Sequence, residues 1–306
     1  MVPVCFFLDT ALKRMHNGIN VSNEMRKGDF QLVIRLIALD LDGTLLTDRK
    51  EILPETWSAL TDAGRAGIEI VPATGRPLSG VPENVLALPC LQYLITSNGA
   101  LTYHVPQKTV LRRHLIPRAE AAQILSELKH PDLLLEIFID GRGYHEAETS
   151  RIMNELYRGT PLENYLAGSR TVVDDLTAFL LSQTDDVENI SILFLEPARM
   201  AEDRIRLSRH KYVTVVQSAP HVLEIGSADA DKGKAVSELA STLGISRSEI
   251  MVFGDSNNDF GLFDSAGTAV AMANATPELK ARAHRITSSN EEDGIGCVLR
   301  EIISAK

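Results

Sequence analysis

The feature that most constrains this chain is a series of short, unbroken apolar runs, each followed at once by polar residues. The runs cover residues 32–39, 68–73, 93–96 and 250–253. Apolar runs of this length between helices are typical of parallel strands that are buried on both faces. Helices are expected from Pro54, which suits a first helical position, and over residues 231–243, where Gly244 supplies the stop. The alternation predicts an α/β fold with a mostly parallel sheet.

The middle of the chain has a different pattern. A helix with Ala121, Leu125 and Leu128 on one face precedes strand-like runs at 133–139, 191–195 and 212–216. We interpret residues 113–218 as an α+β insert that divides one α/β domain into two parts, residues 31–112 and 219–306. Residues 1–30 show no sustained periodicity, so they are expected to be disordered or to precede the true start of the protein.

Composition narrows the class of protein. The 306 residues carry a net charge of −10, which disfavours binding to nucleic acid because that requires a clustered basic face. The three cysteines lack zinc or disulfide spacing. No apolar run approaches the roughly 18 residues of a membrane span. We therefore expect a cytoplasmic protein that does not bind membranes, whereas its oligomeric state cannot be inferred from the sequence.

The polar residues that follow the four runs carry the chemistry. Ligands of parallel α/β sheets bind beyond the carboxyl ends of the strands, so these residues should meet at one edge of the sheet. They form four short stretches: Asp40-Leu41-Asp42-Gly43-Thr44, Thr74-Gly75-Arg76, Ser97-Asn98-Gly99 and Gly254-Asp255-Ser256-Asn257-Asn258-Asp259. An Asp-Gly pair alone is usually only a turn. Four such stretches after four strands favour a functional site.

Several carboxylates at one edge require a positive charge. Two carboxylates 4 Å apart repel by about 4 kcal/mol at an effective dielectric constant near 20. Magnesium is the best candidate, because it prefers oxygen ligands and commonly pairs with substrate phosphate. The group contains no histidine or cysteine, which argues against zinc or copper. Lys232, at the start of the later helix, supplies a second cation.

Three other nucleotide or metal motifs fail at defining positions. Gly75 and Gly80 have P-loop spacing, but valine and proline replace the lysine and hydroxyl residue of that motif. Residues 255–266 imitate half of an EF-hand loop, yet Phe260 holds its glycine position. Residues 141–143 lack the third glycine of a dinucleotide fingerprint. Among the histidines, His145 in the insert is the one of interest.

Taken together, the motifs DLDGT, ATGR, DKG and GDSNND resemble those of the haloacid dehalogenase-like hydrolases, and SNGA, AMANA and SSNEEDG resemble its Cof-type sugar-phosphatase branch. The resemblance covers nearly the whole chain from about residue 35. It implies a Rossmann-like core with a cap inserted between the second and third motifs.

The resemblance also implies roles for individual residues. Asp40 would be the nucleophile that forms an aspartyl-phosphate, and Asp42 the general acid and base. The phosphate group would be bound by Thr74, Gly75, Lys232 and Asn258. The magnesium ligands would be Asp40, Asp42 through its backbone carbonyl, Asp255 and Asp259.

The expected function is magnesium-dependent hydrolysis of small phosphorylated metabolites, with sugar phosphates as the first choice. Two alternatives stay open: a phosphomutase-like phosphotransferase, and a sensor that binds a phosphorylated ligand without turnover. Substrate choice is expected to lie in the cap, where residues 136–146 and 151–157 carry polar and aromatic side chains.

Overall fold

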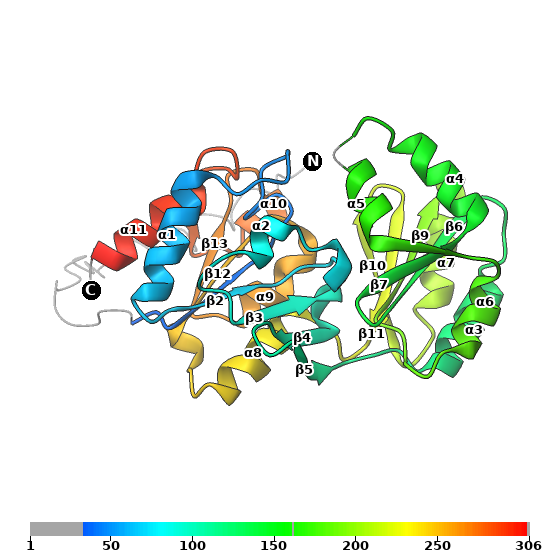
Figure 1. The fold of residues 1–306 in the computed structure, drawn as a ribbon, viewed down its shortest axis with the longest axis horizontal. Helices are drawn as coiled ribbons and strands as arrows, with labels where there is room; N and C mark the ends of the chain where they lie inside the picture. The colour runs from blue at the N-terminus through cyan, green and yellow to red at the C-terminus, as the bar shows by residue number, and fades with distance from the viewer. Residues whose placement is uncertain (1–32, 161, 305–306) are drawn as a thin grey trace, which may run out of the picture. The chain divides into compact units, whose positions relative to one another are not determined.

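The computed structural model describes residues 33–160 and 162–304, so the predicted N-terminal extension, residues 1–30, lies outside the described residues. Five strands form one parallel sheet in the order β14-β13-β12-β1-β2 (Figure 1). Their bounds are β1 Leu36–Leu39, β2 Glu69–Pro72, β12 Ile250–Gly254, β13 Thr268–Ala271 and β14 Arg285–Ile286. The predicted parallel α/β sheet is therefore confirmed.

Helices cover both faces of this sheet because its strands are apolar on both sides. In β1, Ile37 and Leu39 pack into one buried cluster, whereas Leu36 and Ala38 pack into a second cluster on the opposite face. The first cluster is closed by α1 (Pro54–Arg65) and α11 (Gly294–Ser304), which lie side by side in Figure 1. The second is closed by α8 (Lys232–Thr242), α9 (Phe260–Asp264) and α10 (Pro277–Lys280).

The register of β1 sets the position of the site. Leu39 lies level with Phe253 of β12 and with Pro72 of β2. The three strands run in the same direction, so the residues that follow them emerge at one edge of the sheet. The chain places Asp40, Asp255 and Thr74 in these positions.

The predicted strand at residues 93–96 forms, but its pairing differs from the expectation. β3 (Tyr93–Thr96) forms an antiparallel sheet with β4 (Leu101–His104), which pairs in turn with β5 (Thr109–Arg113). Among the described residues, the pairing of this region with the parallel sheet consists of isolated bridges, one of which joins Ala73 and Ile95. The chain reverses directly after β3 at Gly99, whose φ is +98°, so the next strand offers β3 a complete antiparallel ladder.

A six-stranded sheet is built from the middle of the chain, in the order β10-β11-β9-β6-β7-β8. Its strands are β6 Leu133–Ile139, β7 Arg142–Glu146, β8 Arg170–Val173, β9 Asn189–Phe194, β10 Val213–Ala219 and β11 Val222–Ser227. The sheet continues past residue 218, the boundary predicted for the insert, because β11 pairs with both β10 and β9.

Three helices pack on one face of the six-stranded sheet and close its hydrophobic cluster: α3 (Arg118–Glu127), α6 (Leu176–Ser182) and α7 (Met200–Leu207). On the other face, α4 (Ala147–Leu156) and α5 (Leu162–Ser169) form only a small cluster with Leu134 of β6. None of the helices within residues 33–160 and 162–304 combines the length and hydrophobicity of a membrane span.

Replacement of Gly233 by alanine should destabilise the parallel-sheet region. A Cβ on Gly233 would lie 1.9 Å from the backbone oxygen of Gly261, so α8 and α9 would have to separate. Overpacking of this kind costs about 1–3 kcal/mol. We expect Gly233→Ala to lower the free energy of unfolding in urea by at least that amount.

Gly168→Ala is the matched control, because Gly168 also lies in a helix and a Cβ there meets no atom within 4 Å. This control should be neutral or slightly stabilising, since alanine favours a helix more than glycine does. Equal stability of the two variants would show that the contact between α8 and α9 relaxes without cost.

Candidate active site at the edge of the parallel sheet

Asp40 begins the site directly after β1. Its backbone N–H donates to the oxygen of Phe253 at 3.1 Å, and its own carbonyl accepts from Leu45 at 3.2 Å. Only 5% of the residue is exposed. These bonds fix the backbone on both sides of the residue, so its carboxylate has a defined position at the sheet edge.

A residue in the left-handed conformation directly follows Asp42. Gly43 has a φ of +82°, and a Cβ on it would lie 2.5 Å from Oδ2 of Asp255. Glycine is therefore required both by the backbone conformation and by the close approach of that carboxylate. The turn brings the hydroxyl of Thr44 to Oδ1 of Asp255, at 2.9 Å.

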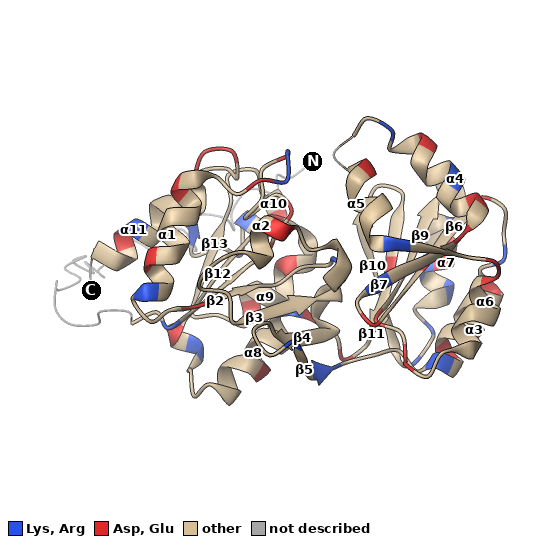
Figure 2. Cartoon of the chain, in the orientation of Figure 1, with Lys and Arg blue, Asp and Glu red and all other residues tan. Residues whose placement is uncertain are grey.

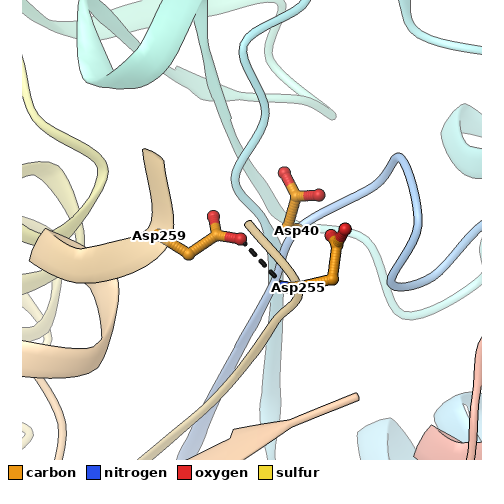
Figure 3. A group of neighbouring side chains, drawn as sticks. All are labelled: Asp40, Asp255 and Asp259. Carbon is orange, nitrogen blue, oxygen red and sulfur yellow. Dashed lines mark hydrogen bonds between the residues drawn. The ribbon is translucent and has the colours of Figure 1, made fainter. Parts of the chain in front are cut away.

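Three carboxylates meet at this edge. One oxygen from each of Asp40, Asp255 and Asp259 lies within 4.8 Å of the other two, and Figure 3 shows the three side chains converging from two segments. Asp259 is held in place by the backbone N–H groups of Asp255 and Ser256, which donate to its Oδ2 at 3.1 and 3.2 Å. Three of the four predicted metal ligands are therefore brought together.

Lys232 joins two of these carboxylates. Its Nζ lies 2.6 Å from Oδ1 of Asp40 and 2.8 Å from Oδ1 of Asp259, and the lysine side chain is fully buried. It starts α8, where the side chain of Asp231 caps the helix. Burial disfavours the charged ammonium, but the charges of Asp259 and Asp40 outweigh burial and raise the pKa of Lys232 above its usual value.

One lysine does not balance three carboxylates. Burial, with the charges of Asp259 and Asp255, raises the pKa of Asp40 well above its usual value despite Lys232. Burial and the charge of Asp259 likewise raise the pKa of Asp255 to about 6. The raised pKa values of Asp40 and Asp255 reflect burial and more negative than positive charge among these side chains. An all-oxygen group of this kind suits a hard divalent cation.

The carboxylate of Asp42 lies outside this group, because two cations hold it elsewhere. Arg76 donates from Nε and Nη2 to its two oxygens, each at 2.6 Å, and Lys50 Nζ lies 2.8 Å from Oδ1. Burial would raise the pKa of Asp42, but Arg76 and Lys50 outweigh burial and lower the pKa to about 2. Coordination by the backbone carbonyl of Asp42 stays a prediction.

The residues predicted to bind phosphate surround Asp40 on two sides. Thr74, Gly75 and Asn258 line a cavity of about 510 Å³ together with Asp40, Asp42 and Asp255. Lys232 lines an adjoining cavity of about 340 Å³, and Asn258 borders both. The structure therefore brings all the predicted site residues to one place.

Two residues of the site were not assigned a role from the sequence. Arg76 binds Asp42 and also lies over the ring of Tyr165, 4.5 Å from its centre. Asn98, in a left-handed conformation with φ of 56°, accepts from Nδ2 of Asn258 at 3.3 Å. Both follow strand ends within the recognised stretches, and that position is the signal that points to them.

Comparisons with known proteins decide the family. The model of the haloacid dehalogenase-like hydrolases matches residues 37–299. The chain belongs to the haloacid dehalogenase-like hydrolase family. The resemblance predicted from the motifs is therefore confirmed.

Similar proteins cover most of the chain. The chain is 32% identical to YxeH of Bacillus subtilis, over 89% of this chain and 99% of that protein. It is 28% identical to the pyridoxal phosphate phosphatase YbhA of Escherichia coli, over 86% and 97%. A solved haloacid dehalogenase-like hydrolase from B. subtilis matches with a TM-score of 0.78 and 28% identity, over 87% of this chain and 99% of that one. The chain is an enzyme, a phosphoric monoester hydrolase.

In this haloacid dehalogenase-like hydrolase, the side of the cavity that faces Asp40 is formed by the middle of the chain. Glu136, Phe138 and Tyr157, which lie in the two polar runs singled out from the sequence, line it. Arg151 does not, because it is exposed and paired with Glu148. His145 is buried, with Nδ1 3.1 Å from Oε1 of Glu136.

Replacement of Lys232 should destabilise the hydrolase when no metal is present. Lys232→Ala leaves the carboxylates of Asp40 and Asp259 buried without their cation, and the loss of one partner of a buried ion pair costs about 3–5 kcal/mol. We expect a corresponding loss in the free energy of unfolding, measured in EDTA.

Lys234→Ala is the matched control, because Lys234 lies two residues after Lys232 in α8 and its side chain is exposed. It should change the free energy of unfolding by less than about 0.5 kcal/mol. Equal losses in the two variants would mean that Lys232 contributes through helix formation and not through its ion pairs.

Proposed function

We propose that this hydrolase is a magnesium-dependent phosphatase of small phosphorylated metabolites, with sugar phosphates as its first substrate class, and that it works through an aspartyl-phosphate on Asp40. The observation that carries the proposal is the position of Asp40. Its carboxylate lies within reach of Asp255, Asp259 and Lys232, and the residue borders a cavity large enough for a small ester.

The nucleophile and its surroundings suit attack on phosphorus. An oxygen of Asp40 forms the new bond to phosphorus as the bond from phosphorus to the alcohol oxygen breaks. Asp40, Asp255 and Asp259 would hold magnesium, which when bound would supply positive charge that offsets the repulsion between carboxylate and phosphate. Lys232, bound to Asp40, adds a second positive charge next to the nucleophile.

Neutral donors complete the phosphate site. The hydroxyl oxygen of Thr74 accepts from the backbone N–H of Arg76 at 3.1 Å, so its hydrogen is available to a phosphoryl oxygen. Asn258 and the backbone of Gly75 border the same cavity. Donors of fixed position stabilise charge that develops on the transferred group.

Asp42 is proposed to move the proton. It gives a proton to the leaving alcohol in the first step and takes one from the water that hydrolyses the aspartyl-phosphate in the second. Its location two residues after the nucleophile and on the same cavity fits this role. In the described conformation Arg76 and Lys50 bind this carboxylate and lower its pKa, so Asp42 can carry the proton for the first step only after these ion pairs open.

The relatives of this hydrolase are named for phosphate esters of different alcohols. The relative YbhA is named for pyridoxal phosphate, whose alcohol is not a sugar. A substrate panel should therefore contain pyridoxal phosphate and an aryl phosphate beside several sugar phosphates. Formation of an isomerised sugar phosphate in place of free phosphate would identify a phosphomutase-like transfer instead.

Asp40→Asn should abolish phosphate release because the amide cannot form the aspartyl-phosphate. We expect kcat to fall by more than about a thousandfold on every substrate of the panel, and wild-type release to require magnesium and to stop in EDTA. Asp62→Asn, an equal change at an exposed site in α1, should leave the rate unchanged. Wild-type turnover by Asp40→Asn would remove this residue from the mechanism.

Asp42→Ala should discriminate between leaving groups. An alkoxide needs a proton to leave, whereas an activated aryl oxide does not, so kcat/KM should fall by about 100-fold or more for a sugar phosphate and by less than about tenfold for 4-nitrophenyl phosphate. Steady-state kinetics on the two esters measure this difference. An equal fall on both would contradict the role of Asp42 as general acid.

A further inference from the structure

One face of the six-stranded sheet lines the cavity, and on it polar residues alternate with apolar ones such as Leu134 and Leu193. Along each central strand, alternate residues point to opposite faces. Leu135 and Ile137 of β6 pack with the hydrophobic cluster beneath α3, α6 and α7, whereas Glu136 between them borders the cavity. Figure 2 shows charged residues on strands of this sheet as well as on its helices. The cavity-facing polar residues of the three central strands are Glu136, Asn189, Ser191 and Glu224.

Two of these residues form a row with Ser191 between them. Glu136 of β6 is level with Ser191 of β9, and Ser191 is level with Glu224 of β11. Neighbouring strands lie about 4.8 Å apart, so the backbones of the two glutamates are about 10 Å apart across β9, and both side chains project from the same surface. The same cavity is lined by Asp40. An ester bound at Asp40 therefore places its alcohol toward this row.

The charge of Glu136 is balanced within the protein. Arg170 donates from Nε to its Oε1 at 2.9 Å and from Nη2 to its Oε2 at 3.2 Å. His145 lies 3.1 Å from the same Oε1. Burial would raise the pKa of Glu136, but the charge of Arg170 and the bond to His145 outweigh burial and lower it. The carboxylate of Glu136 is thus already bound by Arg170 and His145.

Glu224 lacks such a partner among the described residues. No lysine, arginine or histidine of residues 33–160 and 162–304 forms an ion pair with it, and its hydrogen-bond donors are the amide of Asn189, the hydroxyl of Ser191 at 3.3 Å and that of Ser218 at 3.5 Å. Burial, with the charge of Glu136, raises the pKa of Glu224 to about 7. The site therefore holds a carboxyl group that forms no ion pair with a described cation, and the charge of Arg170 offsets only part of the effect of its burial.

Asn189 adds a second acceptor. Its Nδ2 donates to Oε2 of Glu224, which fixes the orientation of the amide. Only 3% of the residue is exposed, and its buried Oδ1 has no hydrogen-bond partner among the described residues. A buried polar atom without a partner costs about 1–3 kcal/mol, so its presence beside a cavity points to a ligand that donates to it.

We propose that Glu224 and Asn189 form the subsite that binds the leaving alcohol of the substrate, and that they select alcohols that carry O–H or N–H donors. This proposal rests on the phosphatase function proposed above and narrows its substrate class to phosphate esters of polyhydroxy or amino alcohols. Esters whose alcohol lacks donors reach Asp40 but leave both acceptors unsatisfied.

Three substrates test the subsite on the wild-type enzyme and on Glu224→Gln, with magnesium present. Glucosamine 6-phosphate offers an ammonium group, glucose 6-phosphate offers hydroxyl groups at the same positions, and 4-nitrophenyl phosphate offers no donor. Glu224→Gln should lower kcat/KM by about tenfold or more for at least one of the sugars and by less than about twofold for the aryl ester. A larger loss with glucosamine 6-phosphate identifies the ammonium as the preferred donor, and equal losses identify the hydroxyls.

Two further variants keep the test decisive. Glu202→Gln makes the same chemical change on an exposed position of α7, on the opposite face of the sheet, and should leave all three rates unchanged. Asn189→Ala retains the carboxylate of Glu224 and should show the same order of losses, so the test survives if Glu224→Gln does not fold in circular dichroism.

The outcomes separate the two proposals. Unchanged kcat/KM on both sugars, or equal losses on all three esters, in an enzyme that releases phosphate would overturn the subsite and leave the phosphatase function intact. Absence of magnesium-dependent release from every ester by the wild-type enzyme would overturn the phosphatase function, and the subsite with it.

Discussion

The buried ion pairs of Lys232 hold the site together. Three carboxylates converge because parallel strands of one sheet end at the same edge, and each pair at this distance repels by about 4 kcal/mol at an effective dielectric constant near 20. The ammonium group offsets part of this repulsion from within the protein. It reaches the edge only because α8 starts there, and α8 can start there only because Gly233 lets it contact the backbone of α9. The packing of α8 against α9 and the charge balance at the sheet edge therefore depend on each other.

The two large sheets divide the chemistry by the polarity of their faces. Strands of the parallel sheet are buried on both sides, so they carry polar groups only beyond their ends, where Asp40 and Asp255 lie. Strands of the six-stranded sheet have one face under α3, α6 and α7, whereas the other face contacts α4 and α5 and also lines the cavity, so polar groups lie along these strands, as Glu136 and Glu224 do. Under the proposed function, the first arrangement serves the phosphate group and the second serves the alcohol.

This difference also explains what the sequence could predict. Strands that are apolar on both faces stand out as unbroken runs, so β1, β2, β3 and β12 were found within a few residues, and the residues after them gave the site. The strands β7 and β11 were missed because charged residues and glycine interrupt their apolar residues, and β8 was missed because only two of its four residues are apolar. β11 matters most, because it carries Glu224. The roles of Arg76 and Asn189 depend on contacts between distant segments, which no local pattern records.

Each of two arginines that line the cavity, Arg76 and Arg170, forms an ion pair with a carboxylate. The guanidinium groups of Arg76 and Arg170 both lie over the ring of Tyr165, 4.5 and 4.6 Å from its centre, and two arginines so close would repel if they were not neutralised. Each has its own carboxylate: Asp42 for Arg76 and Glu136 for Arg170. A continuous series of contacts therefore runs from the strand end after β1 to the face of the six-stranded sheet. In it, the positive charges of Arg76 and Arg170 are already neutralised by carboxylates of the protein. Glu224 forms no ion pair with a cation of the described residues, and under the proposed subsite the alcohol of the substrate supplies a further hydrogen-bond donor to it.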